Sequence, residues 1–128
     1  MFNQTVRVLP ADIDEQDHVN NMVYLRWVQE IAAAHWRSIA SLEAQNAIGW
    51  VVLRHEIDYK NPARPGDEVT LGTWVGKATR LTFERFTEIR RASDDQLLSQ
   101  ARTLWCPIDP ATGRPTRVSA EVRAQFSV

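Results

Sequence analysis

The residues best suited to chemistry in this chain gather in one loop, directly before its longest apolar segment. Asp12, Asp14 and His18 lie in the stretch ADIDEQDHVN, and large apolar residues follow from Met22 onward. A positioned carboxylate can act as a nucleophile or as a general base for water. A histidine close by could orient that carboxylate. Asp14 is therefore the candidate catalytic residue, with His18 as the candidate beside it.

The segment that must position this loop has the pattern of a helix. Residues 21–44 contain no Gly or Pro, and their apolar side chains recur at three- and four-residue steps. This pattern predicts one helix that is buried on much of its circumference, with Asn20 as its N-cap. The amides of Asn21 and of the two residues after it would then be unpaired donors at the positive end of the helix dipole. Such donors can bind a developing oxyanion, so a carboxylate beside them suits acyl transfer.

Most of the other segments alternate with period two, which is typical of strands. Strands are predicted at residues 3–9, 49–60, 68–76, 80–91 and 97–109. In residues 49–60 the alternation sets Leu53 and His55 on one face and Arg54 and Glu56 on the other. The last four strands are expected to form an antiparallel meander. A loosely packed segment or a short helix is expected at the end of the chain.

One very apolar helix and one long antiparallel sheet form two layers, and a sheet that curls round the helix is the simplest way to bury it. A curved five-stranded sheet has exposed edges, and exposed edges invite pairing with another chain. We therefore expect a homo-oligomer, either a homodimer or a homotetramer, that is joined by edge-strand pairing.

The composition limits the classes of function. A length of 128 residues fits one domain, and 44% hydrophobic with 24% charged residues is ordinary for a globular protein. The net charge of -1 gives no broad positive field, so we expect no nucleic-acid partner, whereas an anionic small molecule needs only a few local cations. No apolar run approaches the ~20 residues of a membrane span, and the first residues lack a signal-peptide pattern. We expect a cytoplasmic protein with no membrane partner.

The acidic loop could also suggest a metal site. An EF-hand loop needs Asp or Asn at its fifth position, Gly at its sixth and Glu at its twelfth. This chain has Gln16, Asp17 and Val23 at those positions. The single cysteine, Cys106, excludes Cys-rich zinc spacing and an intrachain disulfide. We predict no bound metal.

Residues 12–30, DIDEQDHVNNMVYLRWVQE, resemble the signature of hot-dog-fold acyl thioesterases of the 4-hydroxybenzoyl-CoA and plant acyl-carrier-protein types. The signature D-x-D-x-x-x-H-V-N-N-x-x-Y-x-x-W-x-x-E is matched at every fixed position. Residues 57–67 and 109–115 also resemble the family, so the similarity covers nearly the whole chain. It implies an α+β fold, with one hot-dog domain over residues 1–128. A five-stranded curved antiparallel sheet would wrap around one long central helix.

The resemblance implies an acyl-CoA thioesterase that releases a free acid and a thiol. Asp14 would be its catalytic nucleophile or general base, and the helix start near Asn21 would polarise the thioester carbonyl. Asn20, Tyr24 and Trp27 are candidate substrate-binding residues, although Asn20 is mainly a helix cap and the two aromatic residues are core or pocket wall. No separate cofactor is implied, because CoA is part of the substrate.

The phosphates of CoA are held in this family by basic residues of the sheet edge and loops, often from the partner subunit. The candidates here are Lys60, Arg64, Lys77 and Arg80. The substrate would be a thioester of CoA or of acyl carrier protein. The five Trp residues of the chain favour an aromatic or medium-chain acyl group, with Trp27, Trp36 and Trp50 near the expected pocket.

Two residues depart from the family pattern. Asp17 stands where many CoA thioesterases have Gly, and Gln16 stands where the plant enzymes have Asn. Asp17 adds a like charge close to Asp14. These departures leave open a non-catalytic acyl-CoA or acyl-carrier binding protein. A hot-dog hydratase or dehydratase is the other alternative, and it would need His35 or His55 to act together with an Asp of another subunit.

Overall fold

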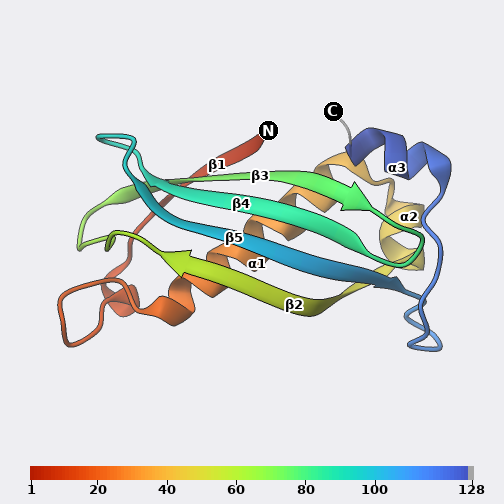
Figure 1. The fold of residues 1–128 in the computed structure, drawn as a ribbon, viewed down its shortest axis with the longest axis horizontal. Helices are drawn as coiled ribbons and strands as arrows, with labels where there is room; N and C mark the ends of the chain where they lie inside the picture. Colours follow the sequence, from red (N-terminus) through yellow and green to blue (C-terminus); the bar gives the residue numbers. More distant parts are fainter. Residues whose placement is uncertain (127–128) are drawn as a thin grey trace.

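The computed structural model describes residues 1–126, and it places a five-stranded antiparallel sheet against one long helix (Figure 1). The helix is α1 (Asn21–Ile39). The strands follow one another across the sheet as β1 (Phe2–Arg7), β3 (Glu68–Ala78), β4 (Phe83–Arg91), β5 (Leu97–Ile108) and β2 (Gly49–Tyr59). The predicted α+β arrangement of one antiparallel sheet and one central helix is confirmed.

The predicted meander of four strands is wrong. Strands β3, β4 and β5 do form a meander, but β2 pairs with β5 and not with β3, so β2 forms an outer edge of the sheet. The connection from β2 to β3 is held by the start of α1 instead of making a hairpin. Its Ala63 carbonyl accepts a hydrogen bond from Val19 N at 2.9 Å, and its Ala63 amide donates to Tyr24 Oη at 2.8 Å.

The predicted helix over residues 21–44 is interrupted. Helix α1 ends at Ile39, Ala40 is extended, and Ser41 caps a second short helix, α2 (Leu42–Ala47), by accepting a hydrogen bond from Ala44 N at 3.1 Å. The chain does end in the expected short helix, α3 (Ala120–Phe126), but α3 is not loosely packed, because Phe126 is buried in the core. A 3-10 turn, η1 (Pro10–Asp12), precedes the candidate loop.

Two strands, β2 and β4, differ from the predictions in ways that have a structural cause. A bulge in β2 shifts the register between Val52 and Arg54 and leaves Leu53 57% exposed, so the strict alternation expected there fails. Strand β4 begins at Phe83 and not at residue 80, because Thr79 N donates to Thr82 O at 2.8 Å and closes a turn before the strand.

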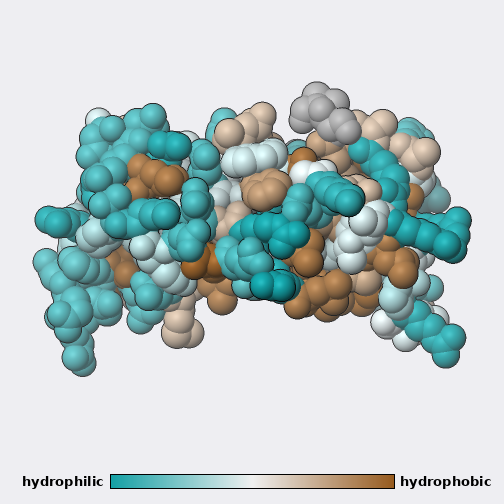
Figure 2. Space-filling model, viewed as in Figure 1, coloured by the Kyte–Doolittle hydropathy of each residue, from teal (hydrophilic) through white to brown (hydrophobic). Residues whose placement is uncertain are grey.

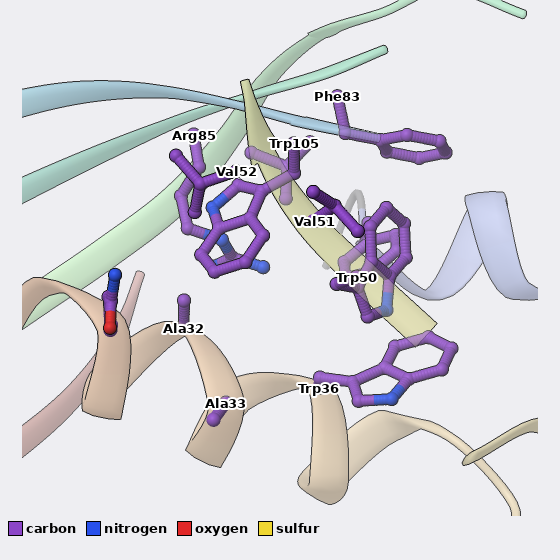
Figure 3. A pocket seen from close by; sticks show the side chains of 12 residues that line it. Ala32, Ala33, Trp36, Trp50, Val51, Val52, Phe83, Arg85 and Trp105 are labelled. Carbon is purple, nitrogen blue, oxygen red and sulfur yellow. The ribbon is translucent and has the colours of Figure 1, made fainter. Parts of the chain in front are cut away.

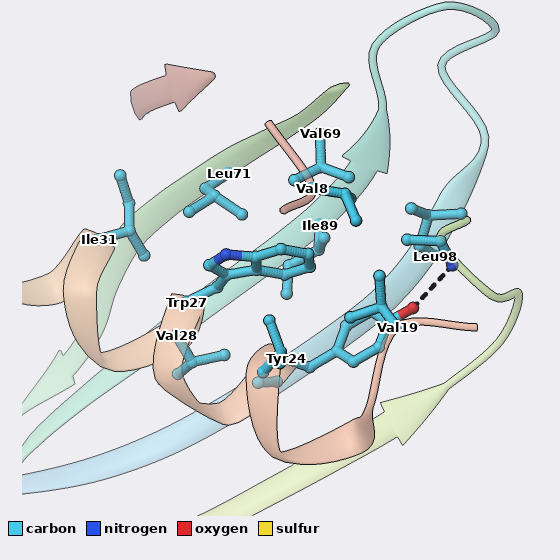
Figure 4. Packing of buried hydrophobic residues seen from close by; sticks show 13 residues of the cluster. Val8, Val19, Tyr24, Trp27, Val28, Ile31, Val69, Leu71, Ile89 and Leu98 are labelled. Atoms are coloured by element: carbon cyan, nitrogen blue, oxygen red, sulfur yellow. Dashed lines mark hydrogen bonds between the residues drawn. The ribbon is translucent and has the colours of Figure 1, made fainter. Parts of the chain in front are cut away.

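The core divides into two clusters along α1. The start cluster packs against the first half of α1 (Figure 4) and consists of Val8, Val19, Val23, Tyr24, Trp27, Val28, Ile31, Ala63, Val69, Leu71, Ile89, Leu98 and Ala101. The end cluster lies at the C-terminal end of α1 and is built from Trp36, Phe83, Val118 and Phe126, with Trp50 and Trp105 among the residues packed against it. No helix within residues 1–126 is long and apolar enough to cross a membrane.

Candidate active site

The loop before α1 is folded back on itself. Ile13 and Val19 form an isolated antiparallel bridge, and Asp14 N donates to His18 O at 2.8 Å. Below the bridge, Asn20 N donates to Asp12 O at 2.8 Å. The loop is therefore a closed turn, and its base is hydrogen-bonded to Asn20, the residue directly before α1.

Asp14 closes this turn with one carboxylate oxygen. Oδ1 accepts hydrogen bonds from Gln16 N at 2.9 Å and from His18 N at 3.3 Å. The side chain is exposed, and Oδ2 has no hydrogen-bond partner within residues 1–126. The structure thus brings Asp14 and His18 together through the His18 main chain. The half-buried His18 ring makes no hydrogen bond in the described part of the chain, so a catalytic role for it stays a prediction.

Asp12 fixes the loop to the helix. Its carboxylate is buried, with 3% of the residue exposed, and Oδ2 accepts a hydrogen bond from Leu9 N at 2.9 Å. Oδ1 pairs with the Arg26 guanidinium of α1 at 3.1 Å. Both oxygens of Asp12 are used in this way, so it is a structural residue and Asp14 is the acid left available for chemistry.

Asn20 caps α1, as predicted, but it accepts hydrogen bonds from two of the amides that were expected to be unpaired. Its Oδ1 accepts from Met22 N at 2.9 Å, and its carbonyl accepts from Val23 N at 2.9 Å. The prediction of three unpaired donors is therefore wrong. Of the three predicted donors, only the Asn21 amide has no acceptor among the described residues. Asn21 is exposed, so this single donor is accessible at the positive end of the α1 dipole.

A cavity of about 580 Å³ lies at the other end of α1, between the helix and the sheet (Figure 3). Binding sites for small molecules typically span ≈ 300–1,000 Å³ and are mostly apolar. The residues that line it are Gln29, Ala32, Ala33, Trp36, Trp50, Val51, Val52, Val75, Phe83, Arg85, Trp105 and Phe126. Trp36 and Trp50 thus lie on the pocket wall, as expected, whereas Trp27 does not.

Arg85 is the one charged residue among the described residues that line this cavity, and the sequence patterns did not single it out. It is 5% exposed, and its Nη1 donates to His35 Nδ1 at 2.9 Å and to Thr73 Oγ1 at 3.2 Å. Burial lowers the pKa of Arg85 to about 10, so it stays charged at neutral pH. Burial and the charge of Arg85 lower the pKa of His35 to about 4, so His35 is neutral and can accept.

The family model of a thioesterase-like superfamily matches residues 8–126. The chain belongs to this superfamily. The predicted resemblance is thereby confirmed, and the Asp14 loop and the α1 start lie within the matched part. Among curated relatives of this thioesterase-like chain, the chloroplastic palmitoyl-acyl carrier protein thioesterase of Gossypium hirsutum is 22% identical over 135 residues. The match covers 98% of this chain and 33% of that protein, so the chain spans about a third of the relative's length.

Solved structures show the same fold as this thioesterase-like chain. Slr0204, a 1,4-dihydroxy-2-naphthoyl-CoA thioesterase from Synechocystis, superposes with a TM-score of 0.85 at 22% identity, over 98% of this chain and 95% of that one. A thioesterase from Thermus thermophilus, complexed with coenzyme A and Zn, has a TM-score of 0.85 at 23% identity, over 98% of this chain and 97% of that one. These likenesses confirm the hot-dog fold.

Two of the candidate substrate-binding residues lie in the packed core of this thioesterase-like domain. Tyr24 and Trp27 are each 2% exposed, and their rings meet edge to face at 5.4 Å between centroids. Tyr24 Oη accepts the Ala63 amide, and burial raises the pKa of Tyr24. Tyr24 and Trp27 are therefore core residues and not part of the pocket wall, because neither lines the cavity.

The four candidate cations divide into two pairs at opposite ends of the sheet. Lys60 and Arg64 follow β2, in the connection that contacts the start of α1. Lys77 and Arg80 lie at the other end, near the turn between β3 and β4 (Figure 1). All four are exposed, and none takes part in an ion pair within residues 1–126. The structure therefore does not bring the four together in one subunit.

The departure from the family pattern at residue 17 has a backbone explanation. Asp17 has a φ of 61°, in the left-handed region that favours glycine, and Asp is one of the few other residues that adopt it. Gln16 contributes its backbone amide, and not its side chain, to Asp14. No three His, Cys, Asp or Glu side chains in the described residues are grouped in a way that could hold a metal ion.

Proposed function

We propose that this protein is an acyl-CoA thioesterase that hydrolyses a thioester to a free carboxylic acid and a thiol. The observation that supports this most directly is the junction at the start of α1. There the accessible Asn21 amide, which has no acceptor in the described part of the chain, follows a loop that presents the free Oδ2 of Asp14. Membership of the thioesterase-like superfamily supports thioester chemistry at such a junction.

In the proposed reaction, the Asn21 N–H donates to the thioester carbonyl oxygen and stabilises the negative charge that develops there. One donor of this kind is typically worth ~2.7–4 kcal/mol of barrier. Asp14 either removes a proton from the attacking water or attacks the carbonyl itself to form an anhydride that water then opens. By either route the C–S bond breaks, the thiol leaves with a proton, and the oxygen of water ends in the acid.

We further propose that the working unit is a two-fold dimer joined along β2. This strand is an unpaired edge within residues 1–126, and it exposes Val51, Leu53 and Tyr59 by 41%, 57% and 46%. Figure 2 shows hydrophobic surface gathered along the lower margin of the molecule, over β2. Exposed apolar edges pair readily, and a two-fold axis uses the same surface of both copies.

A dimer of this kind would complete the site. Two-fold pairing along β2 turns the partner's α1 antiparallel to the first, so the start of one helix approaches the cavity at the end of the other. Within one chain the cavity begins at Gln29, about 12 Å along the helix from Asn21, and extends to Trp36, about 22 Å away. The same rotation brings Lys77 and Arg80 of one subunit toward the partner's Asp14 loop, where they could bind CoA phosphates.

Asp14 variants test the proposed function. Because Asp14→Asn keeps an Oδ1 acceptor for the Gln16 and His18 amides, it removes the charge without opening the loop. We expect Asp14→Asn and Asp14→Ala to lower kcat/KM by ~10²–10⁴-fold on a panel of acyl-CoA thioesters, followed with a thiol reagent. Glu15→Ala is the matched control, because Glu15 is exposed in the same loop.

Full activity in both Asp14 variants, with an unfolding temperature like that of the wild type, would exclude Asp14 as the key residue. Binding of acyl-CoA by the wild type without turnover on any substrate would favour the non-catalytic alternative. Loss of absorbance from an enoyl-CoA, without thiol release, would favour a hydratase. His35 is buried against Arg85, and His55 Nδ1 lies 3.0 Å from Thr103 Oγ1, so neither histidine has an Asp partner within residues 1–126.

A further inference from the structure

Arg85 is a buried positive charge that has no negative partner in residues 1–126. No ion pair there includes it. Its Nη1 uses two neutral acceptors, His35 and Thr73, whereas Nε and Nη2 donate to no described protein group. A buried charge that lacks a counter-charge is costly to a fold, so such a group calls for a ligand or a partner that compensates it.

Among the described residues, the wall around Arg85 has one side-chain acceptor, the amide of Gln29, and no carboxylate. The Nε1 atoms of Trp50 and Trp105 are buried without a hydrogen-bond partner in the described chain, although buried N–H groups normally have one. Both indoles line the same cavity as Arg85, and no Asp or Glu among the described residues lines it. Figure 3 shows Arg85 and Trp105 reaching from the sheet toward Ala32 of α1. The cavity therefore has a mostly apolar wall with one buried positive charge, that of Arg85.

We propose that this cavity takes an acyl group that ends in a carboxylate, with Arg85 binding that carboxylate. The substrate would then be the CoA thioester of one carboxyl of a dicarboxylic acid. This inference rests on the proposed thioesterase function and adds a substrate class to it.

The geometry of Arg85 fits this assignment. Nη1 is held by the protein, which fixes the plane of the guanidinium, and Nε and Nη2 form the side of the fork that matches two carboxylate oxygens. The aromatic and aliphatic wall would contact the carbon atoms between the two ends of the acyl group. A monocarboxylic acyl group of equal length would place a methyl group against Arg85 and leave the charge unpaired.

Three substrates that differ only at the far end of the acyl group test the inference. They are suberyl-CoA, its terminal methyl ester, and octanoyl-CoA. We expect the wild type to prefer suberyl-CoA over octanoyl-CoA by ~10- to 100-fold in kcat/KM, because a hydrogen-bonded charge pair is at stake. Arg85→Met should abolish the preference. Arg7→Met is the matched control and should keep it, because Arg7 is an exposed residue of β1 that pairs with Glu68.

Equal turnover of octanoyl-CoA and suberyl-CoA by the wild type would overturn the inference and leave the thioesterase proposal intact. Equal turnover of suberyl-CoA and its methyl ester would do the same. The ratio of kcat/KM for suberyl-CoA to that for octanoyl-CoA in the wild type tests the inference even if Arg85→Met does not fold. If no thioester is hydrolysed, the proposed function fails, and binding of the free acids decides instead. Suberate must then raise the unfolding temperature of the wild type more than octanoate does, and equal shifts would overturn the inference.

Discussion

Trp27 and Trp36 come from the same helix and face the same sheet, but they meet different surroundings. Trp27 is 2% exposed inside the start cluster, where its neighbours are aliphatic side chains and Tyr24 (Figure 4). Trp36 is 9% exposed, belongs to the end cluster and lines a cavity of about 580 Å³. The comparison indicates that the first half of α1 stabilises the fold, while its second half is left incompletely packed.

The two clusters also differ in how their polar groups are satisfied. In the start cluster the buried Tyr24 hydroxyl has the Ala63 amide as its donor. At the end cluster two indole N–H groups, and part of the Arg85 guanidinium that lies over the Phe126 ring, lack acceptors within the described residues. Interiors are normally close-packed and hydrogen-bonded, so a region that is neither is where a ligand is expected.

The largest effect on stability should come from truncating a side chain of the start cluster. Trp27→Ala should lower the free energy of unfolding by about 3–5 kcal/mol, because it removes a large buried side chain and leaves a void. Trp36→Ala should cost clearly less, because one side of Trp36 faces a cavity and not packed side chains. Denaturant unfolding of both variants measures the difference. Equal losses would mean that the end cluster is packed as firmly as the start cluster, and the contrast would be lost.

The surroundings of the end cluster should also be pH-sensitive, because His35 packs edge to face against Phe126. Burial and Arg85 lower the pKa of His35 from 6.5 to about 4. As the pH falls from about 6.5 to about 4, the unfolded chain takes up a proton that the folded protein does not bind, so the folded state should lose up to about 3 kcal/mol of stability over this window. Above the window this contribution is constant. The measurement is the free energy of unfolding at several pH values.

His35→Gln is the control for this effect. Gln keeps an acceptor for Arg85 Nη1 but does not titrate, so the variant should lose less stability than the wild type between pH 6.5 and about 4. Burial also lowers the pKa of His55, so some acid sensitivity should remain. An unchanged pH profile in His35→Gln would show that His35 is not the titrating group.

Sequence patterns predicted the parts of this molecule that depend on neighbouring residues. The Asn20 cap could be predicted because its side chain accepts a hydrogen bond from an amide only two residues away. The end of α1 was missed because no Gly or Pro marks it; Ala40 is extended, and Ser41 caps the second helix. The place of β2 beside β5 was missed because it depends on contacts between distant segments, such as Val19 with Ala63.

The same limit applies to the site. Asp14 was found through the residues around it, and the loop geometry leaves one of its oxygens free. Arg85 was missed, although it alternates with Phe83 and Thr87 on the buried face of β4. Its charge argued for the surface, and the group that accepts its hydrogen bond, His35, lies 50 residues away in the sequence. The signal in the sequence was the position of Arg85 between the uncharged Phe83 and Thr87 on one face of this period-two pattern, which indicates a buried charge.

The smallest expected effect gives the finest comparison of the two clusters. Trp105→Phe removes a buried N–H that has no acceptor in the described chain, which recovers about 1–3 kcal/mol and offsets the lost ring contacts. The free energy of unfolding should therefore change by less than about 1 kcal/mol. Trp27→Phe is the matched control and should cost more, because it opens a void in the start cluster. Equal costs in the two variants would mean that the Trp105 indole N–H is satisfied in the folded protein, and that the end cluster has no unmet donor there for a ligand.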